Sequence, residues 1–158
     1  MPQIPAPPDP VTDHLLTLLR RDLAAFEAEV QALHQEADLW KKAPGATNAV
    51  GNLALHVAGN LQHFVGGVPT GSGYVRNRAD EFARSSGSSA DVMGELQKAK
   101  LAVDTVLPKL TTRQLAETFP VSIDGQSYPP QVFLLRLRVH LAFCVFGIPL
   151  EAGQDLNL

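Results

Sequence analysis

The fold is decided by the stretch Leu53-Ala-Leu-His56-Val-Ala-Gly-Asn60-Leu-Gln-His63-Phe64. Its apolar residues recur at three- and four-residue steps, which predicts a helix with one buried stripe. We expect this helix to run from about Asn48 to Val65, with His56 at the edge of the stripe. The glycine-rich composition of residues 66–73 predicts that a loop follows it.

Three further segments carry helical patterns. The first runs from Val11 to about Trp40, with Asp9 or Thr12 as its cap. Another opens at Ser88, where the spacing to Asp91 resembles a capping box, and continues to Leu107 before Pro108. Between them, residues 76–84 have room for one or two helical turns.

The last patterned segment, residues 132–148, allows two interpretations. Strict alternation in Leu135-Arg-Leu-Arg-Val-His-Leu is typical of a half-buried strand. The apolar run is nevertheless about three times the length of an ordinary strand, which favours a helix that begins near Pro129-Pro130. In that helix His140 and Cys144 share one face. We expect the preceding residues, 110–130, to be irregular, with a small hairpin turning at Asp124-Gly125.

These elements predict an all-α fold, a four-helix bundle with a long irregular connection before the last helix. The predicted organisation is a proline-rich N-terminal arm at residues 1–10, the bundle at 11–148 and a C-terminal tail at 149–158.

Composition narrows the function classes. The 158 residues are 45% hydrophobic and 18% charged, with a net charge of −3 and no basic block, so we expect no nucleic-acid partner. One cysteine excludes an internal disulfide and fits a reducing compartment. The first ten residues lack the pattern of a signal peptide, and Arg136, Arg138 and His140 interrupt the longest apolar run. We therefore expect a cytoplasmic protein without a membrane partner.

Several motifs resemble the DinB-like superfamily of four-helix-bundle proteins. They are Leu39-Trp40, Pro44-Gly45, Asn48, the stretch from Val50 to Phe64, and Arg78-Ala-Asp-Glu81-Phe82, followed in the expected order by the final segment with His140. The resemblance spans roughly residues 11–144. It implies a four-helix bundle and, as in relatives that are thiol-dependent transferases or isomerases, a divalent metal held by three side chains.

Carried over to this chain, the resemblance implies that His56 and His140 are two of the metal ligands. The third position holds Cys144 where the family has histidine, and Val145-Phe-Gly-Ile-Pro stands where a Gly-Gln pair usually follows. The implied cofactors are zinc or nickel, with a thiol cofactor as cosubstrate.

The residues also support this chemistry directly, with alternatives that stay open. His140 and Cys144 are one helical turn apart, about 6 Å, which suits chelation of one ion. Imidazole and thiolate are good zinc ligands, although a lone cysteine in an apolar helix is also a common core residue. His56 has the alternative of a hydrogen-bonded histidine at the edge of the core.

The remaining polar candidates have both functional and structural interpretations. Asn60 and Arg136 have two interpretations. Either they line the pocket and orient a substrate, or each makes a structural hydrogen bond or extends to solvent. His63 is about 10 Å along the helix from His56, too far to share an ion, so we expect a surface or supporting role. We expect His14 and His34 at the surface, and Arg78 and Glu81 as a structural ion pair.

Two functions follow as hypotheses. The first is a divalent-metal-dependent enzyme, a thiol transferase or hydrolase acting on a small molecule, with the site formed by His56, His140 and Cys144. The alternative is a metal-free, non-enzymatic bundle that acts as a binding or stress-associated protein. The apolar surface of the last helix predicts a homodimer in either case.

Overall fold

The computed structural model describes residues 9–123 and 125–146 of the 158-residue chain. These residues are mostly helical, so the expected all-α class is confirmed. The long helices are α1 (Pro10–Ala32), α2 (Val50–Leu61), α5 (Ser89–Val106) and α7 (Pro130–Phe146). The shorter elements are the 3₁₀ turns η1 (Glu36–Trp40) and η3 (Leu107–Lys109), the π-helix η2 (Gln62–Gly67), the helices α3 (Val68–Thr70), α4 (Arg78–Ala83) and α6 (Thr112–Ala116), and the strands β1 (Ser122–Ile123) and β2 (Gln126–Ser127).

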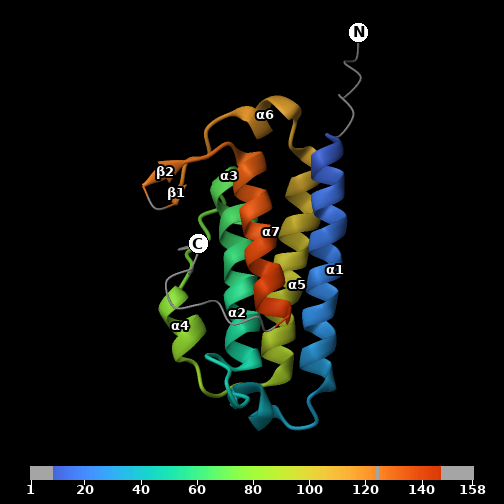
Figure 1. Cartoon of the computed structure of the whole chain (residues 1–158), viewed down its shortest axis with the longest axis vertical. Coiled ribbons are helices and arrows are strands. Elements are labelled where there is room, and N and C mark those ends of the chain that lie inside the picture. The colour runs from blue at the N-terminus through green and yellow to red at the C-terminus, as the bar shows by residue number, and fades with distance from the viewer. Residues whose placement is uncertain (1–8, 124, 147–158) are drawn as a thin grey trace.

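The long helices lie side by side along the long axis of the molecule (Figure 1). Both α1 and α2 pack against α5 and against α7. Each long helix contributes leucines to the shared core: Leu19, Leu61, Leu96 and Leu137 are no more than 1% exposed. This packing makes neighbours of α2 and α7, which are far apart in the sequence, and the candidate site lies between them.

The first helix is shorter than the periodicity predicts. Asp9 caps it by accepting a hydrogen bond from Val11 N, as one of the two expected caps would, and Pro10 occupies its first turn. It ends at Ala32, because the last core residue of the stripe is Val30 and Leu33 adopts an extended conformation. The chain then turns so that Leu39, on the 3₁₀ turn η1, reaches the core. The predicted continuation to Trp40 is therefore wrong.

The second helical segment is longer than predicted. After Leu61 it continues without a break as the π-helix η2 and then as α3 to Thr70. Gly66 and Gly67 lie inside this helical segment, so the predicted loop begins too early. The helix stops at Gly71, whose φ of +63° is readily adopted by glycine and ends the helix in the left-handed conformation.

The crossover segment carries α4 across α2 and leads into α5. The expected capping box at the start of α5 is confirmed, with Ser88 and Asp91 each accepting a hydrogen bond from the other's backbone N–H. The short helix expected within residues 76–84 is α4. The outward edge of α2 is covered by α4 (Figure 1).

The connection before α7 is more ordered than expected. It contains α6, which Thr111 and Gln114 cap reciprocally, and an antiparallel pair in which Ser122 faces Ser127 and Ile123 faces Gln126. Gly125, with a φ of +73°, lies in the predicted turn of this hairpin, while residue 124 lies outside the described residues. The last segment is a helix and not a strand, which settles the ambiguity of its alternating pattern.

Residues 1–8 of the predicted arm and the predicted tail 149–158 lie outside the described residues. Within the described ranges, no helix combines the length and the apolar character needed to cross a membrane.

Candidate metal centre

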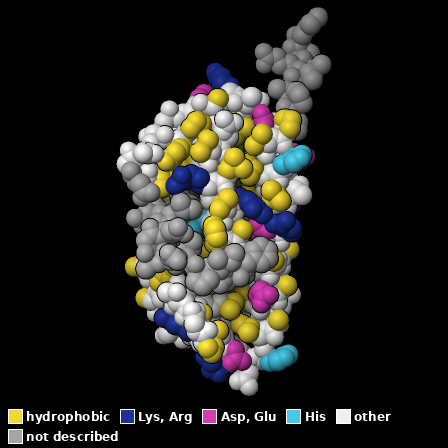
Figure 2. Space-filling model, viewed as in Figure 1, with side chains coloured by type: hydrophobic (Ala, Val, Ile, Leu, Met, Phe, Trp, Pro, Cys, Tyr) yellow, Lys and Arg dark blue, Asp and Glu magenta, His cyan; other side chains and the backbone are white. Residues whose placement is uncertain are grey.

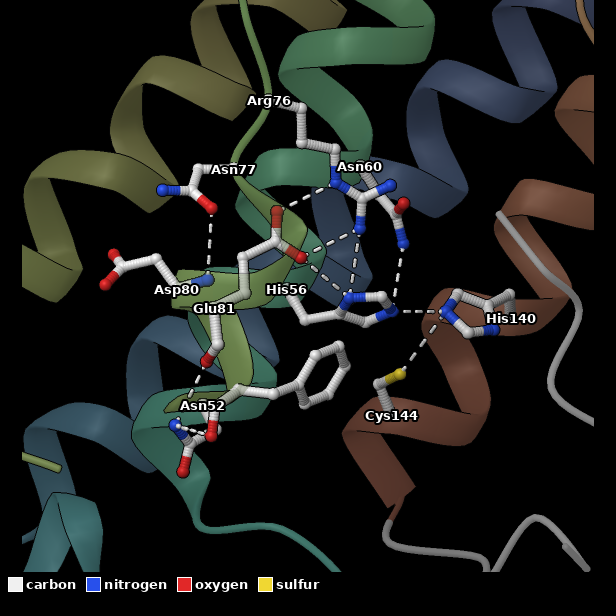
Figure 3. Close-up of polar contacts among 10 residues, drawn as sticks. Asn52, His56, Asn60, Arg76, Asn77, Asp80, Glu81, His140 and Cys144 are labelled. Atoms are coloured by element: carbon white, nitrogen blue, oxygen red, sulfur yellow. Dashed lines mark hydrogen bonds and ion pairs between the residues drawn. The ribbon is translucent and has the colours of Figure 1, made fainter. Parts of the chain in front are cut away.

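Three potential metal ligands meet between α2 and α7 (Figure 3). His56 Nε2 lies 2.9 Å from His140 Nε2, and Cys144 Sγ lies 3.9 Å from the same His140 atom. The ligand atoms of all three residues are within 4.8 Å of one another. Exposed fractions of 3%, 2% and 8% show that the cluster is buried. The convergence expected from the sequence is present, and the cluster could hold a metal ion.

The two separations that involve His140 are close to those of a tetrahedral zinc site. Bond lengths of about 2.0 Å to nitrogen and 2.3 Å to sulfur place two nitrogens about 3.3 Å apart, and a nitrogen and a sulfur about 3.5 Å apart. The separations of 2.9 and 3.9 Å therefore each differ from zinc geometry by about 0.4 Å. Two imidazoles and one thiolate also form a donor set that suits zinc, and imidazole suits nickel.

A carboxylate that no sequence pattern connects with the cluster fixes the orientation of His56. Glu81 Oε2, on α4, lies 2.9 Å from His56 Nδ1. Arg76 donates to both oxygens of this carboxylate, from Nε to Oε1 and from Nη2 to Oε2, each at 2.8 Å. The side chains of Arg76 and Glu81 are each 8% exposed. Metal-binding histidines in proteins commonly have such a carboxylate on the second ring nitrogen.

The charges of this arrangement determine which nitrogen of His56 faces the cluster. Burial is the largest influence on the pKa of Glu81 and would raise it, but hydrogen bonds from Arg76 and His56 outweigh burial and hold the pKa below its usual range. Burial lowers the pKa of His56, and the hydrogen bond to Glu81 offsets only part of that effect. Near pH 7 the pair is therefore a carboxylate beside a neutral imidazole.

The neutral imidazole carries its hydrogen on Nδ1. A carboxylate can only accept a hydrogen bond, so Nδ1–H donates to Glu81 and the lone pair is left on Nε2. Arg76 Nη2 also lies 3.1 Å from Nδ1, but it donates to Glu81 Oε2 at the shorter distance of 2.8 Å. The Nε2 lone pair faces His140, which is the orientation that a metal ligand requires.

Glu81 can reach His56 because residue 59 is a glycine. A Cβ atom at Gly59 would overlap Glu81 Oε1 and lie 2.9 Å from Glu81 Cδ. Glycine in the middle of a helix is otherwise unfavourable, by about 0.5–1 kcal/mol relative to alanine. This isolated glycine in an apolar helix was the signal in the sequence that a second element approaches closely here.

Asn52 holds α4 against α2. Its Nδ2 donates to the carbonyl oxygens of Glu81 at 3.0 Å and Arg84 at 2.8 Å, near the end of α4, and the residue is 6% exposed. The ring of Phe82, the residue after Glu81, lies 4.7 Å from the ring of His56. α4 thus supplies both the carboxylate and an apolar cover for this side of the cluster.

Of the two residues predicted to line the pocket, the structure places one at the cluster. Asn60 is 1% exposed, and its Nδ2 lies 3.2 Å from His56 Nε2. Arg136 instead lies with its guanidinium 4.9 Å from the centre of the Tyr128 ring.

The structure also shows where the other histidines lie and which arginine pairs with Glu81. His63 is half-buried against Phe64, with ring centres 4.7 Å apart, while His14 and His34 are exposed as expected. The predicted pairing of Arg78 with Glu81 is wrong, because Arg76 is the partner of Glu81. Arg78 lies over the ring of Phe82 instead, at 5.4 Å. The sequence correctly predicted an ion pair for Glu81 but not its partner, because Arg76 lies in the loop before α4.

The chain was compared with models of protein families, with curated proteins and with solved structures, and none of the three comparisons found a match.

Proposed function

We propose that the protein is a divalent-metal-dependent enzyme of the DinB-like type, built on a four-helix bundle. The observation that supports this most directly is the buried cluster of His56, His140 and Cys144, oriented by Glu81. If these three side chains hold zinc, their number is that of catalytic zinc sites, since structural zinc sites have four protein ligands.

The chemistry that such an ion supplies when bound is activation of a water molecule or of an incoming thiol. The residues of this chain have distinct parts in it. His56 offers its Nε2 lone pair because Glu81 holds the Nδ1 hydrogen, and Arg76 keeps Glu81 ionised. Phe82 and the helices around the cluster keep bulk water away from these groups, which strengthens their electrostatic interactions. The substrate class that fits is a small molecule, acted on by hydrolase or thiol-transferase chemistry.

A second candidate function is favoured by one distance. The His56–His140 separation of 2.9 Å is that of a hydrogen bond and is shorter than the roughly 3.3 Å of two nitrogens on one zinc ion. The cluster therefore also forms a buried hydrogen-bonded network without an ion. In that case the protein is a metal-free bundle that acts through binding, as a dimer. For either function we propose a cytoplasmic location, because the single cysteine suits a reducing compartment.

Metal analysis of protein purified without an affinity tag distinguishes the two functions. After supplementation with zinc or nickel and removal of excess ion, the enzyme proposal predicts about one ion per chain in the wild type. The His56→Ala variant should lose most of it, whereas His34→Ala, which removes an exposed histidine in the bend after α1, should retain it. A wild-type protein without stoichiometric metal would favour the metal-free function.

A further inference from the structure

Asn60 leaves one polar atom unsatisfied beside the cluster. Its Nδ2 donates toward His56 Nε2 at 3.2 Å, and Figure 3 shows the amide directed at that edge of the imidazole ring. Its Oδ1 is buried and has no hydrogen-bond partner among the described residues. Buried amide oxygens in folded proteins almost always accept a hydrogen bond. An acceptor thus lies next to the candidate ligands with no donor to match it.

The lone pair of His56 Nε2 can be used only once. In the structure it faces two groups, His140 Nε2 and Asn60 Nδ2. If an ion binds this lone pair, His140 becomes a second ligand and Asn60 loses its acceptor. The amide is then released to turn about χ2, a torsion with a broad range in asparagine. Of the described side chains in contact with Nε2, only Asn60 stays available to a fourth ligand.

Resting on the proposed metal site, we infer that Asn60 Oδ1 accepts a hydrogen bond from a water molecule at the fourth coordination position. Water carries hydrogens that satisfy the acceptor, whereas a thiolate carries none. The buried amide therefore favours water over a thiol in this position. This assigns hydrolysis, with water as the nucleophile, in preference to thiol transfer.

The test compares thiol binding in three proteins loaded with cobalt(II), using 2-mercaptoethanol as the probe. Binding of the thiol is followed by the thiolate-to-cobalt absorption that it adds to that of Cys144. Asn60→Leu removes the acceptor while keeping the volume, so the thiol should bind about tenfold more tightly than in the wild type. Asn60→Asp keeps an acceptor oxygen at the same place and should bind the thiol no more tightly than the wild type. If Asn60→Leu does not fold, Asn60→Ala is used in its place.

The possible results test the role of Asn60 separately from the proposed metal site. Equal thiol affinity in the wild type and Asn60→Leu, with equal cobalt content, would overturn the role of Asn60 and leave the metal site standing. A wild type that binds no cobalt would overturn the metal site and the role of Asn60 together. Tighter thiol binding in Asn60→Leu, but not in Asn60→Asp, supports the role of Asn60 as the acceptor for water.

Discussion

Replacing Gly59 by alanine should weaken metal binding although the new residue is a better helix former. In an open helical position this change would stabilise the protein by about 0.5–1 kcal/mol. At residue 59 the added Cβ would overlap Glu81 Oε1, so the carboxylate must move away from His56 and from Arg76. Loss of hydrogen bonds to a buried charged group costs about 1.5–3 kcal/mol. We therefore expect a net loss of about 1–2 kcal/mol in the free energy of unfolding.

The same displacement removes the group that orients His56. Partners of this kind typically contribute 10- to 100-fold to metal affinity, so zinc should bind Gly59→Ala about 10- to 100-fold more weakly. Competition with a chromophoric chelator measures the affinity, and urea unfolding measures the stability. Gly94→Ala is the matched control, because Gly94 also lies in a long helix and a Cβ there meets nothing within 4 Å. If Gly59→Ala matched Gly94→Ala in stability and in zinc affinity, Glu81 would not be held against α2 as described.

Three further predictions test the surroundings of the cluster. Glu81→Gln removes the charge that orients His56 and should weaken zinc binding about 10- to 100-fold in the same competition assay; Glu95→Gln, whose carboxylate contacts Lys98 and Gln62 instead, should not. Stability of the metal-free protein should fall on acidification, because the pKa values of His56 and Glu81 are lowered from 6.5 and 4.5, so the unfolded chain takes up protons first. Melting temperatures should therefore drop below about pH 6.5 and again below about pH 4.5, and a rise would contradict the burial of the pair. Finally, hydrophobic side chains gather on the face that carries α7 (Figure 2), where Leu135 and Val139 are 48% and 43% exposed. We predict a homodimer through this face, which Leu135→Lys should dissociate in analytical ultracentrifugation; a monomeric wild type at micromolar concentration would exclude it.

The sequence predicted the helices well where periodicity and caps agree. The start of α1 at Asp9 and the capping box at Ser88 are local hydrogen-bonding patterns, so they can be recognised without the rest of the fold. The ends of helices were predicted less well. α1 ends early and Leu39 reaches the core from the 3₁₀ turn that follows, while Gly67 is buried within a helical segment where composition predicted a loop.

Only part of the candidate site could be predicted from the sequence, because local spacing does not show how distant segments pack together. His140 and Cys144 share one face of one helix, so their proximity follows from spacing. The pairing of Glu81 with Arg76 and His56 depends on how the crossover segment lies on α2, which no local pattern specifies. Gly59 in an apolar helix signals a close neighbour, but only the structure identifies that neighbour as Glu81.

X-ray absorption at the zinc edge tests most directly whether one ion is shared between α2 and α7. We predict a shell with one sulfur at about 2.3 Å and two imidazole nitrogens at about 2.0 Å, with the sulfur lost in Cys144→Ser. A zinc shell made only of nitrogen and oxygen in the wild type would contradict it, because Cys144 would then not belong to the centre.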